Sequence, residues 1–506
     1  MGAARRARGA GVNVPLFSAR SSRSWGIGEL PDLVPLASWA ASAGFDRLML
    51  LPLGTMPDGE TSPYAASSTM SIDPVFIAPD DVSDFTRVGG IDRLSPNAIE
   101  ARAAARNSDR VRYDLVRAAK REALEHAFEA FVAEEWSQFT TRASHLAAYI
   151  ARERWWLDDY ALFHAISRTM PDRSWRDWPD GLRDHDARAV DDARRQFARD
   201  VLREQYWQWI AEGQWQHARR AAAAKGVKVV GDLPFVASTH SADVWARQDE
   251  FRLDVSAGVP PDAFSEDGQD WGLPTYRWER IAQNDYEWIR RRARRMASLF
   301  DGLRVDHVIG LFRTYGRPRE GTPFFTPADE DDQRRQGETI VSILRDAGID
   351  LIAEDLGTVP DFVRASLTSL GVPGCRVLRW ERDWHAPTQP FLDPATFPAR
   401  SAALTGTHDT EPLAAWWDQL PVAERAQLLA LPGLASRGLV DALMPWSPAL
   451  HEALVAMAMS SGSDQVFLPI QDVFGIRDRI NVPGTVGPKN WTWCLPWPVE
   501  ALPQQF

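Results

Sequence analysis

Short runs of apolar residues recur along the chain, and each has the length of a β-strand between turn residues. Most of these runs are apolar on both faces, which is typical of strands buried in a parallel sheet. Eight of them predict strands at residues 13–17, 46–53, 227–233, 300–306, 349–354, 375–380, 402–407 and 465–471.

Segments with helical periodicity lie between the predicted strands. The pattern predicts helices over residues 33–43 and 339–347, and a glycine, the usual helix stop signal, follows each of them. Strands that alternate with helices indicate the α/β class, and eight of them indicate a (β/α)₈ TIM barrel. We therefore expect one catalytic barrel over residues 1–506, without a C-terminal β-domain.

The spacing of the strands predicts two insertions within this barrel. Residues 54–226 are mainly amphipathic helix, including helices at 144–168 and 191–225, and indicate a helical subdomain. Residues 236–299 form a second insertion. Its 258–278 part is too rich in Gly, Pro and Asp for a helix, so it predicts a long loop that serves as an active-site lid.

Composition narrows the function classes. Hydrophobic residues make up 44% and charged residues 25%, which excludes a disordered or fibrous chain. A net charge of −12 makes duplex nucleic acid and anionic membranes poor partners. The 22 tryptophans suit stacking on sugar rings, although tryptophan is also good core filler.

The cysteines and the N-terminus predict the compartment. Only Cys375 and Cys494 are present, which favours a reducing environment. The basic start, residues 1–13, has no apolar core of a secretion signal, and we expect a frayed tail there. No apolar run approaches the roughly 18–20 residues of a membrane span. We expect a soluble cytoplasmic protein, monomeric or homodimeric.

Three predicted strands end in an acid with polar neighbours. These acids are Asp306, Glu354 and Asp409, and His307 and His408 lie beside two of them. In a (β/α)₈ barrel the C-terminal strand ends meet at one mouth, where the chemistry takes place. Two carboxylates that flank a sugar C1–O bond are the equipment of glycosidic chemistry. The pattern therefore predicts a carbohydrate-active site.

Arg304 indicates the roles of these acids. Side chains alternate along a strand, so Arg304 and Asp306 point to the same side, and the guanidinium favours the ionised form of Asp306 as nucleophile. Glu354 has no basic neighbour in sequence and is the better general acid. Asp409 would be a third, non-covalent carboxylate. Arg304 could instead form a buried ion pair that only holds the barrel together.

The two histidines also leave alternatives open. His307 and His408 could bind sugar hydroxyls, or they could be satisfied core histidines. A metal site is not favoured, because the sequence has neither HExxH nor a ligand-spaced Cys/His cluster. We expect no metal and no cofactor.

The chain resembles the amylomaltases, the 4-α-glucanotransferase (disproportionating enzyme) family of the α-amylase clan that lacks the usual C-terminal β-domain. The resemblance runs nearly end to end, in the family's order. Its motifs are SWGIGEL (24–30), the SPY-containing segment 51–74, GDLPF (231–235), the 258–278 loop, DGLRVDH (301–307), IAEDLG (352–357), TGTHD (405–409) and RINVPGTVGPKNWTWCL (479–495).

The resemblance implies a retaining double displacement through a covalent glucosyl–Asp306 intermediate, with Glu354 as acid/base and Asp409 as transition-state carboxylate. It also implies sugar contacts by Tyr64, Asp232, Gln269, Trp271, Arg304, His307, His408 and Asn481. The implied substrates are maltooligosaccharides and starch- or glycogen-type α-glucans, with glucose as an acceptor. An amylase-type calcium site is not implied.

The sequence departs from the family's usual pattern at Ala65, Leu273 and Thr410. None of these positions is a catalytic carboxylate, so the departures bear on acceptor preference and product size. A plain α-1,4-glucan hydrolase of the same clan stays an alternative. A catalytically dead carbohydrate-binding barrel is a second one, and the three intact acids argue against it.

Overall fold

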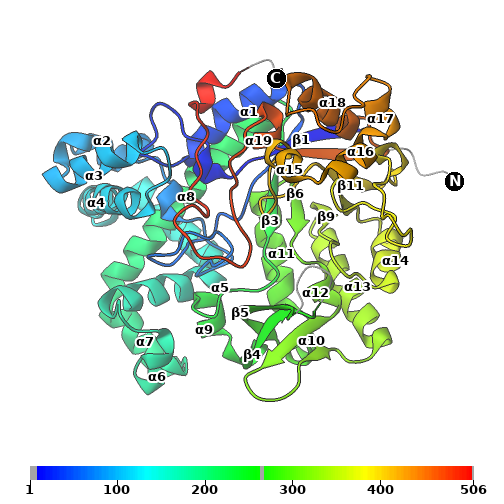
Figure 1. Cartoon of the computed structure of the whole chain (residues 1–506). Helices are drawn as coiled ribbons and strands as arrows, with labels where there is room; N and C mark the ends of the chain where they lie inside the picture. The colour runs from blue at the N-terminus through cyan, green and yellow to red at the C-terminus, as the bar shows by residue number, and fades with distance from the viewer. Residues whose placement is uncertain (1–7, 262–266, 504–506) are drawn as a thin grey trace.

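Eight parallel strands close into a barrel in the order β1-β2-β3-β6-β9-β10-β11-β12. The computed structural model describes residues 8–261 and 267–503. The strands are β1 (Gly9–Asn13), β2 (Arg47–Met49), β3 (Lys228–Leu233), β6 (Gly302–Val305), β9 (Asp350–Ala353), β10 (Gly374–Val377), β11 (Ser401–Leu404) and β12 (Gln465–Pro469). The predicted (β/α)₈ barrel is confirmed (Figure 1).

The first strand lies earlier than predicted. Residues 13–17 were expected as a strand, but β1 ends at Asn13 and Leu16–Ser18 is a 3₁₀ turn. Pro15 cannot donate to a ladder, which disfavours a strand through it. β1 itself is built of small residues because its neighbours come close: a Cβ on Gly11 would lie 2.5 Å from the Phe467 ring. Residues 9–13 are thus not a frayed tail, and residues 1–7 lie outside the described part of the chain.

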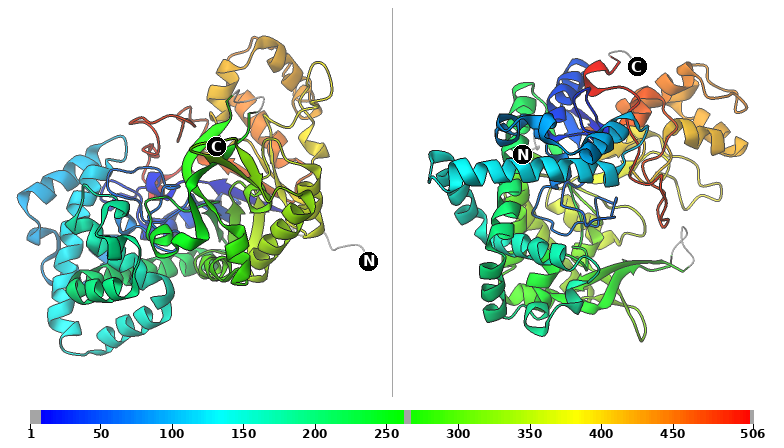
Figure 2. Two further views of the ribbon diagram at one scale, coloured as in Figure 1. Left: turned by 90° about the horizontal axis from the view of Figure 1, so that it is seen from below. Right: turned by 90° about the vertical axis from the view of Figure 1, so that its left-hand side faces the viewer.

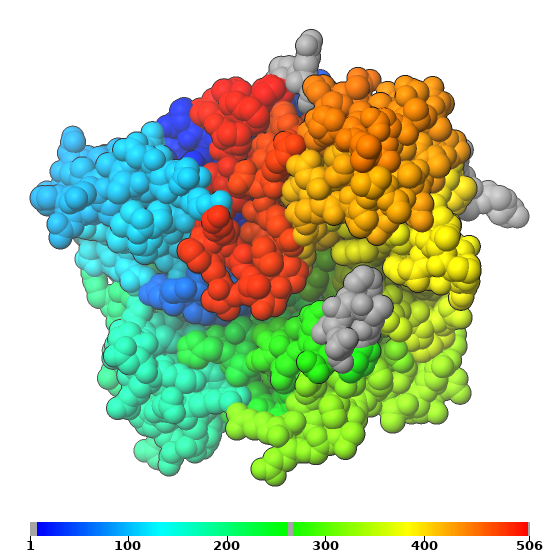
Figure 3. All heavy atoms as spheres, viewed as in Figure 1, coloured from blue at the N-terminus to red at the C-terminus, as the bar shows by residue number. Residues whose placement is uncertain are grey.

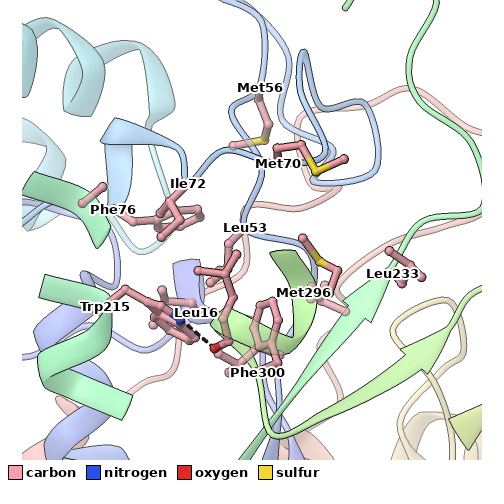
Figure 4. Packing of buried hydrophobic residues seen from close by; sticks show 14 of the residues in the cluster. Leu16, Leu53, Met56, Met70, Ile72, Phe76, Trp215, Leu233, Met296 and Phe300 are labelled. Atoms are coloured by element: carbon pink, nitrogen blue, oxygen red, sulfur yellow. Dashed lines mark hydrogen bonds between the residues drawn. The ribbon is translucent and has the colours of Figure 1, made fainter. Parts of the chain in front are cut away.

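Helices lie between most successive strands of the barrel. They are α1 (Leu33–Ser42), α8 (Ala198–Ala224), α11 (Glu287–Leu299), α13 (Glu330–Asp346), α14 (Asp361–Ser369) and α18 (Pro448–Met459). Trp215 of α8 packs edge-on against Phe300 with ring centroids 5.5 Å apart, and its Nε1 donates to the Leu299 carbonyl at 2.8 Å (Figure 4). Apolar packing and a satisfied indole N–H together fix α8 on the barrel.

The long segment between β2 and β3 is helical, as its periodicity predicts. Before α8 it forms α2 (Ser83–Arg87), α3 (Pro96–Asn107), α4 (Tyr113–Phe131), α5 (Thr141–Thr169), α6 (Asp180–Arg183) and α7 (Ala187–Gln196). Figure 2 shows these helices gathered on one side of the molecule. The single helix expected over 191–225 is divided at Phe197, which has φ −100° and ψ 21° and packs against the core.

The segment between β3 and β6 contains β-structure that the sequence pattern did not predict. β4 (Phe251–Val259) and β5 (Gln269–Tyr276) pair antiparallel and continue through β7 (Thr314–Pro318) to β8 (Phe324–Thr326), in the order β5-β4-β7-β8. The long loop expected over 258–278 is therefore wrong for residues 258–259 and 269–276, and its residues 262–266 lie outside the described part of the chain. Gly, Pro and Asp exclude a helix but tolerate an edge strand, and β5 is an edge, where Pro274 needs no ladder hydrogen bond.

After β12 the chain forms α19 (Ile470–Phe474) and then runs without a named strand through residues 475–503, ending in the 3₁₀ turn Val499–Ala501. Cys375 and Cys494 are both buried and free. Within residues 8–261 and 267–503, no helix has both the length and the apolar character required to cross a bilayer.

Candidate active site

The C-terminal ends of the barrel strands carry four acids. Asp232 is the last residue but one of β3, Asp306 follows β6, Glu354 follows β9, and Asp409 lies in the loop after β11. Because these strands are parallel neighbours in the barrel, their carboxyl ends open on one face. The side chains predicted from strand ends are thus brought to one mouth.

Arg304 joins two of these acids. Its Nη1 donates to both carboxylate oxygens of Asp232, at 2.9 and 2.7 Å, and to Oδ1 of Asp306 at 3.0 Å. Asp232 and Arg304 are directly opposite in the β3–β6 register. The predicted placement of Arg304 and Asp306 on one side is confirmed. Arg304 also makes the buried ion pair that was the alternative, so it holds β3 to β6 and orients Asp306 at once.

Tyr64 brings the segment after β2 into the same network. Its hydroxyl donates to Oδ2 of Asp232 at 2.7 Å and lies 3.5 Å from Nδ1 of His408. Its ring stacks on His408 with centroids 5.1 Å apart. Burial, with the charge of Asp232, raises the pKa of Tyr64 well above its ordinary value. The phenol therefore stays a neutral hydrogen-bond donor and offers an apolar face to the mouth.

Glu354 has the electrostatics of a proton donor. Its pKa is raised to about 8, chiefly by burial and also by the charge of Asp306, while Arg304 and the hydrogen bond from the His307 backbone lower it. One carboxyl oxygen accepts the backbone N–H of His307 at 2.7 Å. His307 has φ +43°, a left-handed conformation that is uncommon for a side chain of this size. The strained turn after β6 thus aims an N–H at Glu354.

Trp271 and Gln269 of β5 reach the same side of the mouth. The Trp271 ring stands perpendicular to His307 with centroids 4.8 Å apart, and its Nε1 donates to Oε1 of Gln269 at 3.0 Å. Burial lowers the pKa of His307 to about 4, although Asp306 raises it. His307 is consequently neutral near pH 7, with one ring N–H to donate.

Asp409 is held as a carboxylate. His408 Nε2 lies 3.4 Å from Oδ2, and Asn481 Nδ2 donates to Oδ1 at 2.6 Å. Burial alone would raise the pKa of Asp409, but the charge of His408 and hydrogen bonds from His408 and Asn481 hold it well below its ordinary range. In turn Asp409 raises the pKa of His408, against the effect of burial. The pair is an ion pair in one wall of the site.

All eleven predicted site residues therefore lie in two linked groups around Asp306 and Glu354. Figure 3 shows the surface hollowed between the red C-terminal segment and the green segment that contains β4 and β5. Sequence reasoning missed Trp491, whose ring lies 5.8 Å from Tyr64 and 5.6 Å from His408. Its signal was present in the NWTW stretch of the C-terminal motif, but no periodicity distinguishes a site tryptophan from a core one.

The described residues contain no group of three His, Cys, Asp or Glu side chains arranged to hold a metal ion. The ionisable groups of the mouth are instead engaged with one another. The arrangement provides one carboxyl with a raised pKa, three acids paired with Arg304 or His408, and aromatic faces, which suits a sugar ring that develops positive charge.

Comparison with known proteins agrees with this chemistry. The family model described as 4-alpha-glucanotransferase matches residues 14–499. A 4-alpha-glucanotransferase of Chlamydia pneumoniae is 31% identical over 505 residues, covering 97% of this chain and 92% of that protein. One from Thermus thermophilus is 33% identical over 477 residues, covering 91% and 89%.

Solved structures agree on the fold. The amylomaltase from Corynebacterium glutamicum superposes with a TM-score of 0.80 at 26% identity, covering 97% of this chain and 72% of that one. The amylomaltase from Streptococcus agalactiae in complex with acarbose also gives 0.80, at 24% identity, covering 96% and 95%. The family model covers every strand end that carries a site acid, so the chain belongs to the 4-alpha-glucanotransferase family, a family of enzymes.

Proposed function

We propose that the chain transfers α-1,4-glucan segments from a donor maltooligosaccharide, starch or glycogen chain to the 4-hydroxyl of an acceptor glucan or glucose. The reaction is a retaining double displacement. Asp306 attacks the anomeric carbon while Glu354 protonates the leaving oxygen. The acceptor hydroxyl then gives its proton to Glu354 and displaces Asp306, which restores both groups.

The different surroundings of Glu354 and Asp306 carry this proposal. Glu354 has a pKa near 8 because it is buried, so it holds a proton at neutral pH. Asp306, beside it, accepts a hydrogen bond from the permanently charged Arg304. A general acid and a nucleophile need this division. The same Arg304 also stabilises Asp306 when it is released as a leaving carboxylate.

Asp409 supports the developing charge. An oxocarbenium-like transition state is positive at the ring, and a fixed carboxylate close to it lowers its energy. His408 and Asn481 keep that carboxylate ionised and in place. Asp232, Tyr64, Arg304 and His307 supply the hydrogen-bonding groups for the sugar hydroxyls of the donor.

Transfer needs a sugar, not water, to reach the covalent intermediate. Trp271 stands at right angles to His307, at the rim of the mouth, and is only half-buried. An indole there offers an acceptor sugar an apolar face and displaces water from the intermediate. We assign Trp271 and Gln269 to this rim.

Incubation of the purified enzyme with maltotriose tests the proposal. Transfer yields glucose together with a ladder of longer maltooligosaccharides at nearly constant total reducing ends. The Asp306→Asn variant, which keeps the size of the side chain, should yield neither product. A steady rise in reducing ends without longer products would identify a hydrolase and overturn the assignment.

A further inference from the structure

Arg479, in the segment after α19, engages all three nitrogens of its guanidinium group. Nε donates to the Asn481 carbonyl at 3.1 Å, Nη2 donates to the Asp409 carbonyl at 2.6 Å, and Nη1 pairs with the carboxylate of Glu411. Two of these partners are backbone carbonyls of Asn481 and Asp409, whose side chains are hydrogen-bonded to each other in the site. The third partner, the Glu411 carboxylate, belongs to the loop after β11.

Glu411 also binds a second arginine, Arg379. Arg379, just after β10, donates from Nη1 to Oε2 of Glu411 at 3.0 Å and from Nη2 to the Glu411 carbonyl. Arg379 is buried and its guanidinium lies 5.0 Å from the Trp416 ring centre. A carboxylate between two guanidinium groups offsets the repulsion between them. We call Arg379, Glu411 and Arg479 the clamp.

The clamp lies beside the hydrogen bond between Asn481 and Asp409. Asn481 Nδ2 donates to Asp409 Oδ1 at 2.6 Å, and this bond joins the loop after β11 to the C-terminal segment. The guanidinium group of Arg479 donates to the backbone carbonyls of both Asn481 and Asp409. Because this group is planar and rigid, it fixes the distance between the two residues. A lysine keeps the charge but cannot make the three contacts.

We propose that Arg479, seated by Glu411 and Arg379, is a positioning residue that sets the Asp409 carboxylate against Asn481 for the reaction. Arg479 touches main-chain atoms of the site and acts through Asp409 and Asn481. This inference rests on the proposed function, since it takes its importance from the role of Asp409.

A change in pH dependence distinguishes positioning from mere stability. The groups that act on Asp409 are His408 and Arg304, by charge, and Asn481, by its hydrogen bond, all of which lower its pKa. Arg479 and Glu411 lie next to its main chain. If the Asn481 bond loosens, the pKa of Asp409 rises. The carboxylate is then lost at a higher pH on acidification, and the acidic limb of the kcat profile moves up.

The test compares Arg479→Lys and Glu411→Gln with Arg477→Ala as a matched control. Arg477 belongs to the same segment but forms an exposed pair with Asp418, at 2.9 Å. For Arg479→Lys we expect kcat to fall about 10²-fold, as for a displacement of about 1 Å at an active site, with KM little changed. The acidic limb should shift upward. Glu411→Gln should do the same more weakly, and Arg477→Ala should match the wild type.

The rate is measured as total cleavage of glycosidic bonds, so the two proposals fail separately. Hydrolysis in place of transfer by the wild type would contradict the proposed function, and the cleavage rates of the variants would still decide whether the clamp positions Asp409. Wild-type kcat in Arg479→Lys would overturn the clamp. A lower kcat with an unmoved acidic limb and a lower melting temperature would also overturn it, because that is the pattern of a stabilising residue only.

Discussion

Burial and pairing give chemically similar side chains different roles in this site. Glu354, enclosed and bonded to one backbone N–H, keeps its proton near neutral pH. Asp409, whose side chain is partly exposed, has a pKa held well below its ordinary range by the charge of His408 and by hydrogen bonds from His408 and Asn481. The residue type is a carboxylic acid in both cases, so the neighbours decide which of them donates a proton.

The state of Glu354 predicts an alkaline limit to activity. A carboxyl with a pKa of about 8 is protonated below that pH and loses its proton above it, so kcat/KM should fall as the pH rises through about 8. The measurement is a profile of kcat/KM against pH from about 5 to about 10, a range that extends well below and above the expected limit. Because Glu354 and Asp306 interact, the observed limit belongs to the pair.

Glu354→Gln provides the control for that profile. The amide cannot give up a proton, so kcat should fall about 10²–10⁴-fold and the alkaline limb should disappear. If the limb near pH 8 persisted in Glu354→Gln, another group would be the acid.

Two strands of an unpredicted sheet carry the outer part of the site. β4 and β5 pair with a register shift between Arg252 and Ser256, and Gly258 lies so close to β5 that a Cβ would meet the Gln269 carbonyl at 2.0 Å. A glycine at this close approach lets the two strands pair tightly. Trp271 thereby stands on a paired strand and not on a free loop. A rigid support is what a residue that excludes water requires.

Removal of the Trp271 indole predicts a change in product and not simply a loss of rate. In Trp271→Ala, water gains access to the covalent intermediate and the acceptor sugar loses an apolar face. The ratio of hydrolysis to transfer with maltotriose should rise about 10-fold, the effect of losing roughly 1.4 kcal/mol of discrimination. Glucose release and ladder formation are quantified in the same reaction.

Phe139→Ala is the matched control, because this ring is 89% exposed and lies in the segment between β2 and β3. It should leave the ratio unchanged. A Trp271→Ala enzyme with the wild-type ratio would remove Trp271 from the rim of the site.

At the scale of the whole molecule, one lysine joins helix α4, in the segment between β2 and β3, to the segment that precedes α1. Lys120 of α4 is almost fully buried, and its ammonium lies 2.7 Å from Glu29 Oε1 and donates to the carbonyls of Val75 and Ile77, each at 2.7 Å. Three donors meet three acceptors, which is the full capacity of an ammonium group. The chain has 57 Lys and Arg residues, of which only four are Lys. At this buried position the chain has the compact ammonium group of lysine and not the larger guanidinium group of arginine.

Replacement of this lysine should destabilise the protein strongly. Lys120→Met leaves Glu29 buried without its charge partner, at a cost of roughly 3–5 kcal/mol in the free energy of unfolding. Urea unfolding followed by tryptophan fluorescence measures it. Addition of Glu29→Gln should recover part of the loss, because it removes the stranded charge. Lys225→Met, at an exposed position, should unfold like the wild type. An unchanged midpoint for Lys120→Met would show that the buried pair contributes nothing.

The extent to which sequence predicts this molecule depends on the range of the forces involved. The strands β2, β3, β6, β9, β10, β11 and β12 overlap predicted apolar runs, because burial on both faces of a barrel leaves a local record in composition. β1 left no such record, since close packing against Phe467 required Gly and Ala in place of large apolar residues. β5 was hidden for a similar reason: an edge strand tolerates the Gly and Pro that otherwise mark a loop.

The sequence alone determined the barrel, the three acids at its strand ends and the partnership of Arg304 with Asp306, because strand periodicity and parallel topology fix those positions locally. Tertiary structure decided the rest. Which acid keeps a proton depends on desolvation and on partners from distant segments, such as Asn481, which lowers the pKa of Asp409, and Asp306, which raises the pKa of Glu354. The Arg379–Glu411–Arg479 clamp joins three segments far apart in the chain, and no local pattern records a contact that exists only after the barrel has closed.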